Sequence, residues 1–243
     1  MKDVSENVQS TYDNQYTNSD AQWRLMGGRQ KAGNIIRLCS RLKAKSVVDI
    51  GSGDGAVLSF LDKENFSDNI SSLEISDSGI EKIKARQMKS LKEVNKFDGY
   101  KIPYSDKSFD LAMCSHVLEH VEHPRLLLRE IARVSNHQFF EVPIDFSFFV
   151  DNKIKHYLDY GHINIFTPAL FKFLLKSEGF EVISEEFVFI TPDQVRFAYK
   201  GKPLKIAVQL LKNFIINLSP YRKVKPSAYT VLCKHDGKGL NIF

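Results

Sequence analysis

Apolar residues occur along the chain either in short, largely apolar runs or at helical spacing. Short runs bounded by glycine or polar residues are typical of buried strands. Seven such runs predict strands over residues 46–50, 69–76, 93–98, 109–115, 137–143, 180–190 and 227–235. Helical spacing predicts helices over residues 28–44, 56–61, 77–91, 116–134 and 167–179, and a further helix after Pro203.

Capping residues indicate where several of these helices begin and end. Asp77 or Ser78 is expected to cap one helix, and Thr167 and Gly179 bound another. Pro124 interrupts or restarts the helix that follows the fourth strand. Five strands alternate with helices and two more follow, so we predict an α/β fold with a doubly wound, seven-stranded, mostly parallel sheet.

Size and composition are those of a globular protein. The chain has 243 residues, 43% apolar and 26% charged, and a single core can serve about 250 residues. We therefore expect one domain over residues 1–243. The apolar stretch at 204–218 contains two lysines and is shorter than the ~20 residues of a membrane span, and the N-terminus has no secretory h-region, so a cytoplasmic protein is expected. Three cysteines without metal-type spacing predict neither disulfides nor a zinc site.

The sequence VVDIGSGDGAV, residues 47–57, places three glycines at alternating positions directly after the first strand. In a doubly wound sheet this loop lies at the carboxyl edge, where ligands bind. Glycines let the backbone turn sharply and approach a ligand closely. The spacing is neither that of a dinucleotide loop nor that of a phosphate loop, and no lysine follows it. The predicted cofactor contacts of this loop are Asp49, Gly51, Ser52, Gly53, Asp54 and Gly55.

Acidic residues around the loop indicate a cationic nucleoside as the ligand. Asp49 and Asp54 would repel a pyrophosphate but suit an ammonium and a sulfonium group. Glu74, followed by Ile75, ends the second strand and is placed to accept hydrogen bonds from two ribose hydroxyls. Asp98, near the end of the third strand, could accept one from an adenine amino group.

The segments VVDIGSGDG, LEIS, FDGYKIPYSDKSFDLAMCSHVLEHVEHPRLLLREIARV and GHINIFTPALFKFLLKSEGF together resemble the class I S-adenosylmethionine-dependent methyltransferases, in the branch that acts on small molecules. The resemblance covers roughly residues 30–190 and implies a Rossmann-like fold, S-adenosylmethionine as cofactor and S-adenosylhomocysteine as product. It also implies contacts with the methionine part by Asp49, Gly51 and Gly53, with the ribose by Glu74, with the adenine by Asp98 and Gly99, and with the sulfonium by Cys114 and Ser115.

Histidines just beyond the fourth strand are candidate bases. A hydroxyl acceptor must lose a proton, for which a histidine is suited, whereas an amine acceptor only has to be neutral. His116 is predicted to face the site, with His120 one helical turn further along. Relatives that methylate quinone precursors have a glutamate at the position of His116 and bind a divalent metal with the Glu-His pair that follows. The replacement leaves a metal at His116, Glu119 and His120 as an open alternative, and no metal is included in the prediction.

Residues 144–166 are predicted to form a lid over the acceptor, and residues 1–30 a cap over the cofactor. Aromatic rings of the lid can stack on an acceptor, although core packing explains several of them equally well. The predicted acceptor contacts are Tyr16, Trp23, Asp145, Phe148, Tyr157 and Tyr160. His156 and His162 of the lid are alternative bases.

Residues 191–226 contain eight basic residues and one acidic residue, a net charge of +7 in a chain of net charge +5. This basic helical insertion could cover the sheet with its lysines in solvent, attract an anionic acceptor, or make peripheral contact with an anionic membrane. The Asn/Asp-Pro-Pro-aromatic motif of base-amine methylases does not occur, which disfavours nucleic acid as a partner.

The leading prediction is therefore a methyltransferase that acts on an oxygen or nitrogen atom of a small metabolite, such as a sugar or a secondary metabolite. One alternative is an RNA or protein methyltransferase that docks through residues 191–226. Another is a non-catalytic, cofactor-binding partner protein. A homodimer is compatible with the sequence.

Overall fold

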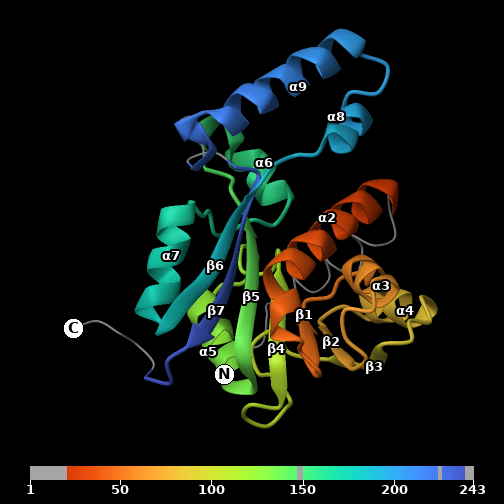
Figure 1. Cartoon of the computed structure of the whole chain (residues 1–243), viewed down its shortest axis with the longest axis vertical. Helices are drawn as coiled ribbons and strands as arrows, with labels where there is room; N and C mark the ends of the chain where they lie inside the picture. Colours follow the sequence, from red (N-terminus) through yellow and green to blue (C-terminus); the bar gives the residue numbers. More distant parts are fainter. Residues whose placement is uncertain (1–20, 147–149, 224–225, 239–243) are drawn as a thin grey trace.

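A computed structural model describes residues 21–146, 150–223 and 226–238 (Figure 1). In this part of the chain one sheet has the strand order β3-β2-β1-β4-β5-β7-β6. The strands are β1 Val47–Ile50, β2 Ile70–Glu74, β3 Leu91–Lys96, β4 Phe109–Ser115, β5 Ser135–Pro143, β6 Phe180–Val188 and β7 Ala228–His235. Strands β1 to β5 pair in parallel, and β7 lies antiparallel between β5 and β6. The predicted doubly wound, mostly parallel sheet is confirmed.

Helices cover both faces of this sheet (Figure 1). The helices of the described residues are α2 Ala21–Cys39, α3 Ala56–Lys63, α4 Asp77–Ala85, α5 Pro124–Val134, α6 Ile154–Asp159, α7 Pro168–Ser177, α8 Pro192–Ala198 and α9 Pro203–Leu218, with 3-10 turns η1 Ser40–Leu42, η2 Val150–Lys153 and η3 Pro220–Lys223. Ile35 of α2 and Leu58 of α3 belong to one buried cluster, whereas Ile131 of α5 and Phe171 of α7 belong to the other. The two cores lie on opposite faces because side chains along a strand alternate between the two sides of the sheet.

Several predicted helix boundaries are wrong. The helix predicted over residues 28–44 is α2, which begins at Ala21 and ends at Cys39, and the helix predicted over residues 77–91 is α4, which ends at Ala85. The helix after β4 begins only at Pro124, and residues 116–123 form an irregular loop in which His116 has a φ of 57°. His116 and His120 are therefore not one helical turn apart. The cap of α4 is Ser76, not Asp77 or Ser78, because the Ser76 hydroxyl accepts a hydrogen bond from the Gly79 amide at 3.2 Å.

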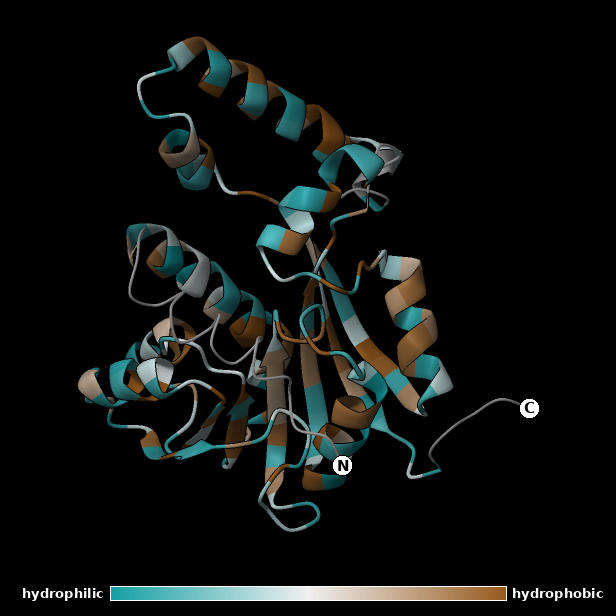
Figure 2. Ribbon diagram, turned by 180° about the vertical axis from the view of Figure 1, so that it is seen from behind, coloured by the Kyte–Doolittle hydropathy of each residue, from teal (hydrophilic) through white to brown (hydrophobic). Residues whose placement is uncertain are grey.

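The basic insertion forms α8, α9 and η3 beyond the carboxyl ends of the strands (Figure 1). The predicted helix after Pro203 is confirmed as α9, but none of its residues is buried, so it does not cover the sheet. Apolar positions recur along it beside polar ones (Figure 2). Among the described helices, none combines the length and the apolar character needed to cross a bilayer.

Candidate functional site

The glycine loop turns sharply between β1 and α3. Gly51, Gly53 and Gly55 have φ values of 74°, 59° and 74°, a region that residues with a Cβ rarely adopt. The Gly51 amide donates a hydrogen bond to the Leu73 carbonyl at 2.8 Å, which ties the loop to β2. A Cβ at Gly51 would lie 2.4 Å from Val117 Cγ2, so this position has no room for a side chain.

Asp49 is a buried carboxyl at the base of the loop, 5% exposed. Burial raises its pKa to about 6, with a smaller increase from the nearby Glu74, against the opposing effects of Ser52 and Lys31. A cation beside Asp49 would favour the ionised carboxylate. Asp54 is different, because Arg24 at 3.3 Å and Arg86 at 3.2 Å offset its charge.

Glu74 lies against the glycine loop and is 2% exposed. One carboxylate oxygen accepts a hydrogen bond from the Gly53 amide at 2.7 Å. The other accepts hydrogen bonds from the Ser76 amide at 3.1 Å and the Ser76 hydroxyl at 2.8 Å. Burial raises the pKa of Glu74 despite these bonds. Through its bond to Gly53, Glu74 holds the glycine loop in shape.

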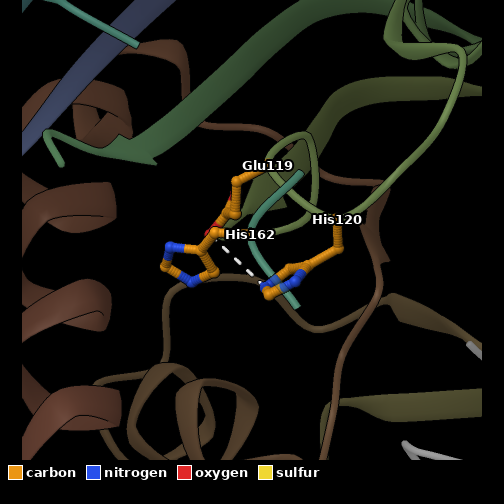
Figure 3. A group of neighbouring side chains, drawn as sticks. All are labelled: Glu119, His120 and His162. Atoms are coloured by element: carbon orange, nitrogen blue, oxygen red, sulfur yellow. Dashed lines mark ion pairs between the residues drawn. The ribbon is translucent and has the colours of Figure 1, made fainter. Parts of the chain in front are cut away.

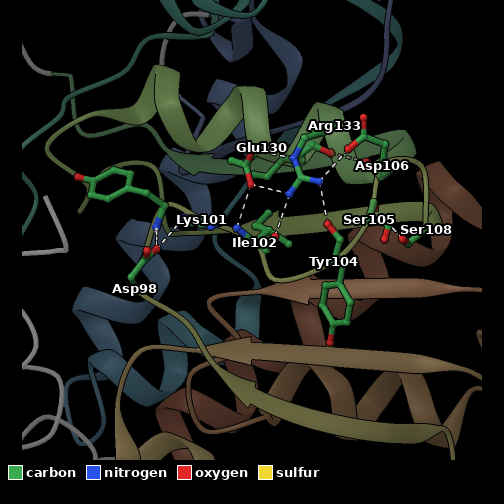
Figure 4. Close-up of polar contacts among 12 residues, drawn as sticks. Asp98, Lys101, Ile102, Tyr104, Ser105, Asp106, Ser108, Glu130 and Arg133 are labelled. Carbon is green, nitrogen blue, oxygen red and sulfur yellow. Dashed lines mark hydrogen bonds and ion pairs between the residues drawn. The ribbon is translucent and has the colours of Figure 1, made fainter. Parts of the chain in front are cut away.

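Asp98 organises the segment that follows β3 (Figure 4). Its carboxylate accepts hydrogen bonds from the Tyr100 amide at 2.8 Å and the Lys101 amide at 2.6 Å, and Gly99, between Asp98 and Tyr100, has a φ of 90°. Further along, Arg133 of α5 donates to the Ile102 carbonyl at 2.9 Å and so holds the segment against α5.

A cavity of about 470 Å³ opens at the carboxyl edge of the sheet. The residues that line it at the glycine loop are Asp49, Gly51, Ser52, Gly53 and Asp54. On its other side the cavity is lined by residues from the end of β4, the loop after β4, β5 and residues 160–162. They are Ser115, His116, Glu119, His120, Glu141, Tyr160 and His162, and Trp23 of α2 lines the cavity as well. The structure thus brings most of the predicted loop residues together with three of the predicted histidines.

Other predicted residues lie outside this cavity lining. Cys114 is fully buried in the core, and burial raises its thiol pKa well above the usual value, so it packs inside and does not face the cavity. Gly55, Glu74, Ile75, Asp98 and Gly99 also do not line the cavity, and they lie around the loop and beyond β2 and β3.

Glu141, which the sequence patterns did not single out, holds His116, and Asn34 in turn holds Glu141. Glu141 of β5 is 2% exposed, and its Oε1 lies 3.0 Å from His116 Nε2. Asn34 Nδ2 donates to the other carboxylate oxygen at 2.9 Å. Burial alone would raise the pKa of Glu141, but His116, Lys31 and Asn34 together outweigh it and hold the pKa below the usual value. In the sequence, the signal for this role is the charge of Glu141 within the otherwise apolar run FFEVP.

The family follows from comparison with known proteins. The family described as "Methyltransferase domain" matches residues 23–185. The chain belongs to this methyltransferase family. Its cofactor is accordingly S-adenosylmethionine, and it is a class I, S-adenosylmethionine-dependent methyltransferase with the Rossmann-like fold that the sequence predicted. No curated protein matches the chain.

Solved structures share the fold of this methyltransferase at low sequence identity. A Haloferax volcanii methyltransferase in complex with the activator Trm112 is 15% identical, with a TM-score of 0.66 over 92% of this chain and 97% of that one. An S-adenosylmethionine-dependent methyltransferase from Archaeoglobus fulgidus is 21% identical, with a TM-score of 0.59 over 92% and 98%. A sarcosine dimethylglycine methyltransferase from Galdieria sulphuraria is 17% identical, with a TM-score of 0.58 over 85% and 83%.

The residues around the cavity fit S-adenosylmethionine. The glycine loop offers backbone without side chains, and the buried Asp49 carboxyl can pair with a cationic group. The hydroxyl of Ser115, at the end of β4, is buried and has no hydrogen-bond partner among the described residues. Such an atom is costly unless a ligand satisfies it. The methyltransferase thus presents acidic and polar groups where a cationic nucleoside would lie.

Residues 144–166, which the sequence predicts as a lid, place their predicted site residues in different environments. Tyr160 is 59% exposed and lines the cavity, whereas Tyr157 is buried and its hydroxyl donates to the Asp145 carbonyl. His156 packs edge-on against Tyr160 at a ring distance of 4.8 Å and does not line the cavity. Asp145 does not line it either, but lies 2.5 Å from His162 Nδ1. The predictions for Tyr16 and Phe148 lie outside the described residues.

Proposed function

We propose that this methyltransferase transfers the methyl group of S-adenosylmethionine to an oxygen or nitrogen atom of a small metabolite. The observation that carries the proposal is the cavity, which joins the glycine loop to a group of histidines and carboxylates from β4, β5 and the lid. These polar groups can orient a small acceptor and take up its proton.

In this proposal Asp49 pairs with the ammonium group of the cofactor, and the backbone of Gly51 and Gly53 lies along its methionine part. Glu74 both shapes the loop and contributes to the ribose site, and Asp98 with Gly99 borders the adenine. These roles agree with the burial of Asp49 and with the hydrogen bond between Glu74 and Gly53. Ser115, the last residue of β4, then lies beside the sulfonium, and His116, which follows it and lines the cavity, lies on the acceptor side.

The cofactor supplies a methyl group on a positively charged sulfur. When bound, it would pass this methyl group to the acceptor atom, its sulfur would keep the electron pair of the broken sulfur–carbon bond, and it would leave as S-adenosylhomocysteine. Most of the acceleration comes from aligning the acceptor with this axis. His116 Nδ1 takes the proton of a hydroxyl acceptor, while Glu141 holds Nε2 at 3.0 Å and so orients the ring.

Two measurements test the proposal. Calorimetric titration with S-adenosylmethionine and S-adenosylhomocysteine should show micromolar binding, and NAD, the control, should not bind. Release of S-adenosylhomocysteine is then followed with a panel of small hydroxyl and amine acceptors and with bulk RNA and protein. Turnover only with RNA or protein would overturn the small-molecule proposal in favour of those substrates, and cofactor binding without any turnover would indicate a non-catalytic protein.

Once an acceptor is found, His116→Ala should lower kcat by roughly 10²-fold and leave cofactor affinity unchanged. His137→Ala is the matched control, because His137 lies near the start of β5 and outside the cavity lining, and it should keep wild-type kcat. Wild-type kcat in the His116 variant would contradict its role as proton acceptor.

We also infer that the basic insertion contacts an anionic bilayer surface. One side of α9 presents an apolar stripe at helical spacing whose members are 45–77% exposed. The stripe consists of Leu204, Val208, Leu211, Ile215 and Leu218. Lys200, Lys202, Lys205 and Lys212 lie on or just before the same helix, and a basic amphipathic helix is suited to anionic lipid headgroups.

Co-sedimentation with vesicles tests this contact. Vesicles of phosphatidylcholine with phosphatidylserine should retain the protein, and pure phosphatidylcholine should retain much less. Leu211→Asp should abolish retention, whereas Leu170→Asp, on an equally exposed position of α7, should not. Equal retention of both variants would overturn the inference. Loss of a dimer in Leu211→Asp without any vesicle binding would assign the stripe to a second copy of the chain instead.

A further inference from the structure

Glu119, His120 and His162 lie together at the acceptor side of the cavity (Figure 3). Each offers one ligand atom, and these three atoms lie within 4.8 Å of one another. Glu119 and His120 come from the loop after β4, and His162 comes from the lid more than forty residues later. Two imidazole nitrogens and one carboxylate oxygen form a common donor set for divalent transition metals.

Glu119 is a buried carboxylate without a compensating hydrogen bond. Its side chain is 0% exposed, and neither oxygen has a hydrogen-bond partner among the described residues. Its Oε1 lies 3.4 Å from His116 Nδ1 and 3.7 Å from His120 Nε2, and these rings carry charge only when protonated. An uncompensated buried carboxylate is strongly unfavourable, so this position calls for a cation.

Outer partners hold both histidine rings by their Nδ1 atoms. His120 Nδ1 lies 2.9 Å from the Gly161 carbonyl oxygen, and His162 Nδ1 lies 2.5 Å from Asp145 Oδ2. Histidines that bind metals almost always donate their other ring nitrogen to a carbonyl or a carboxylate in this way. These contacts occupy Nδ1 of each ring and leave Nε2 as the atom that can bind a metal. His116 differs, since Glu141 holds its Nε2.

We propose that Glu119, His120 and His162 bind one divalent transition-metal ion. The mixed nitrogen and oxygen donor set suits Zn²⁺, Co²⁺, Fe²⁺ or Mn²⁺ and is unsuited to Ca²⁺ and Mg²⁺, which prefer oxygen ligands. All three residues line the cavity, so the remaining coordination positions face the space for the acceptor. This site replaces the sequence-based expectation of no metal and differs from the open alternative at His116 by its third ligand, His162.

The site also gives the lid a second function. His162 and Asp145 both belong to residues 144–166, whereas Glu119 and His120 follow β4. An ion bound by Glu119, His120 and His162 together would link residues 144–166 to the loop that follows β4. The inference goes beyond the proposed function, because it holds for any acceptor that reaches the cavity.

Metal binding by the full chain tests the proposal without cofactor or acceptor, so its outcome is separate from that of the methyl-transfer proposal. Protein treated with EDTA and dialysed is titrated with Co²⁺, followed by its visible absorption bands, and Zn²⁺ affinity is measured by competition. We expect one Co²⁺ per chain. Glu119→Gln, His120→Gln and His162→Gln should each weaken binding by at least ~10²-fold.

Asp145→Asn tests the outer partner and should weaken binding by about 10–100-fold with the stoichiometry kept at one. His137→Gln is the control for binding to an unrelated histidine, and it should bind as the wild type does. Circular dichroism without metal checks that each variant folds, and Glu119→Gln keeps the side-chain shape while removing the charge. Absence of a one-to-one Co²⁺ complex in the wild type would overturn the proposal, as would wild-type affinity in the folded Glu119 and His162 variants.

Discussion

The Glu74 carboxylate accepts a hydrogen bond at 2.7 Å from the amide of Gly53, in the middle of the glycine loop. This contact joins the carboxyl ends of β1 and β2. It means that a residue expected to touch the ribose also fixes the loop expected to touch the methionine part. Loop shape and ligand contact are therefore coupled through one side chain.

Replacing Glu74 with alanine should affect both stability and cofactor binding. Loss of a buried, charged hydrogen-bond acceptor should lower the free energy of unfolding by about 2–3 kcal/mol. Affinity for S-adenosylmethionine should fall by more than ~10-fold, because the loop and the ribose site both lose the carboxylate. Urea denaturation and calorimetry measure the two effects. Unchanged stability with weakened binding would show a ligand contact alone, and unchanged affinity would contradict the assignment.

Cofactor affinity should depend on pH through Asp49. Burial raises the pKa of this carboxyl to about 6, so it is largely protonated at pH 5 and ionised at pH 7. A cationic ligand binds the ionised form, so affinity should fall as the pH drops below 6, by up to roughly tenfold per unit. Calorimetry at pH 5, 6 and 7 tests this. Asp49→Asn should bind weakly at every pH, and an equal pH dependence in wild type and variant would assign the effect to another group.

Gly51→Ala should destabilise the protein. The φ of 74° is strained for alanine, and the new Cβ would meet Val117 at 2.4 Å, so the free energy of unfolding should fall by about 2–4 kcal/mol. Gly27→Ala is the matched control, because nothing lies within 4 Å of its Cβ and the residue is inside α2. That change should stabilise by about 0.5–1 kcal/mol. Chemical denaturation compares the two, and equal stability would contradict the strain argument.

Glu141→Gln should slow turnover without weakening substrate binding. Glutamine keeps the shape and a hydrogen-bonding group beside His116, but it removes the charge that favours the protonated ring. We expect kcat to fall by at least ~10-fold with KM for the acceptor and affinity for the cofactor nearly unchanged. Steady-state kinetics at saturating cofactor measure this split. A rise in KM alone would make Glu141 a binding residue and not a positioning one.

Local sequence patterns predicted the sheet and the glycine loop correctly. The apolar runs and the glycines at 51, 53 and 55 report backbone conformation and burial directly, because strand, turn and helix each impose their own spacing. The loop at residues 116–123 was missed, since its apolar residues also fit a helical period. The left-handed backbone of His116 and the start of α5 at Pro124 show that residues 116–123 form a loop and not a helix.

The sequence by itself therefore determined the order of strands and helices, the glycine loop and the acidic residues near it. Only the tertiary structure decided which polar groups meet, such as Glu141 with His116 and His162 with Glu119 and His120. These residues lie 25 or more positions apart, apart from the adjacent Glu119 and His120. Sequence spacing carries no record of such contacts, because they form only when neighbouring strands pair and distant loops meet at the carboxyl ends of the strands.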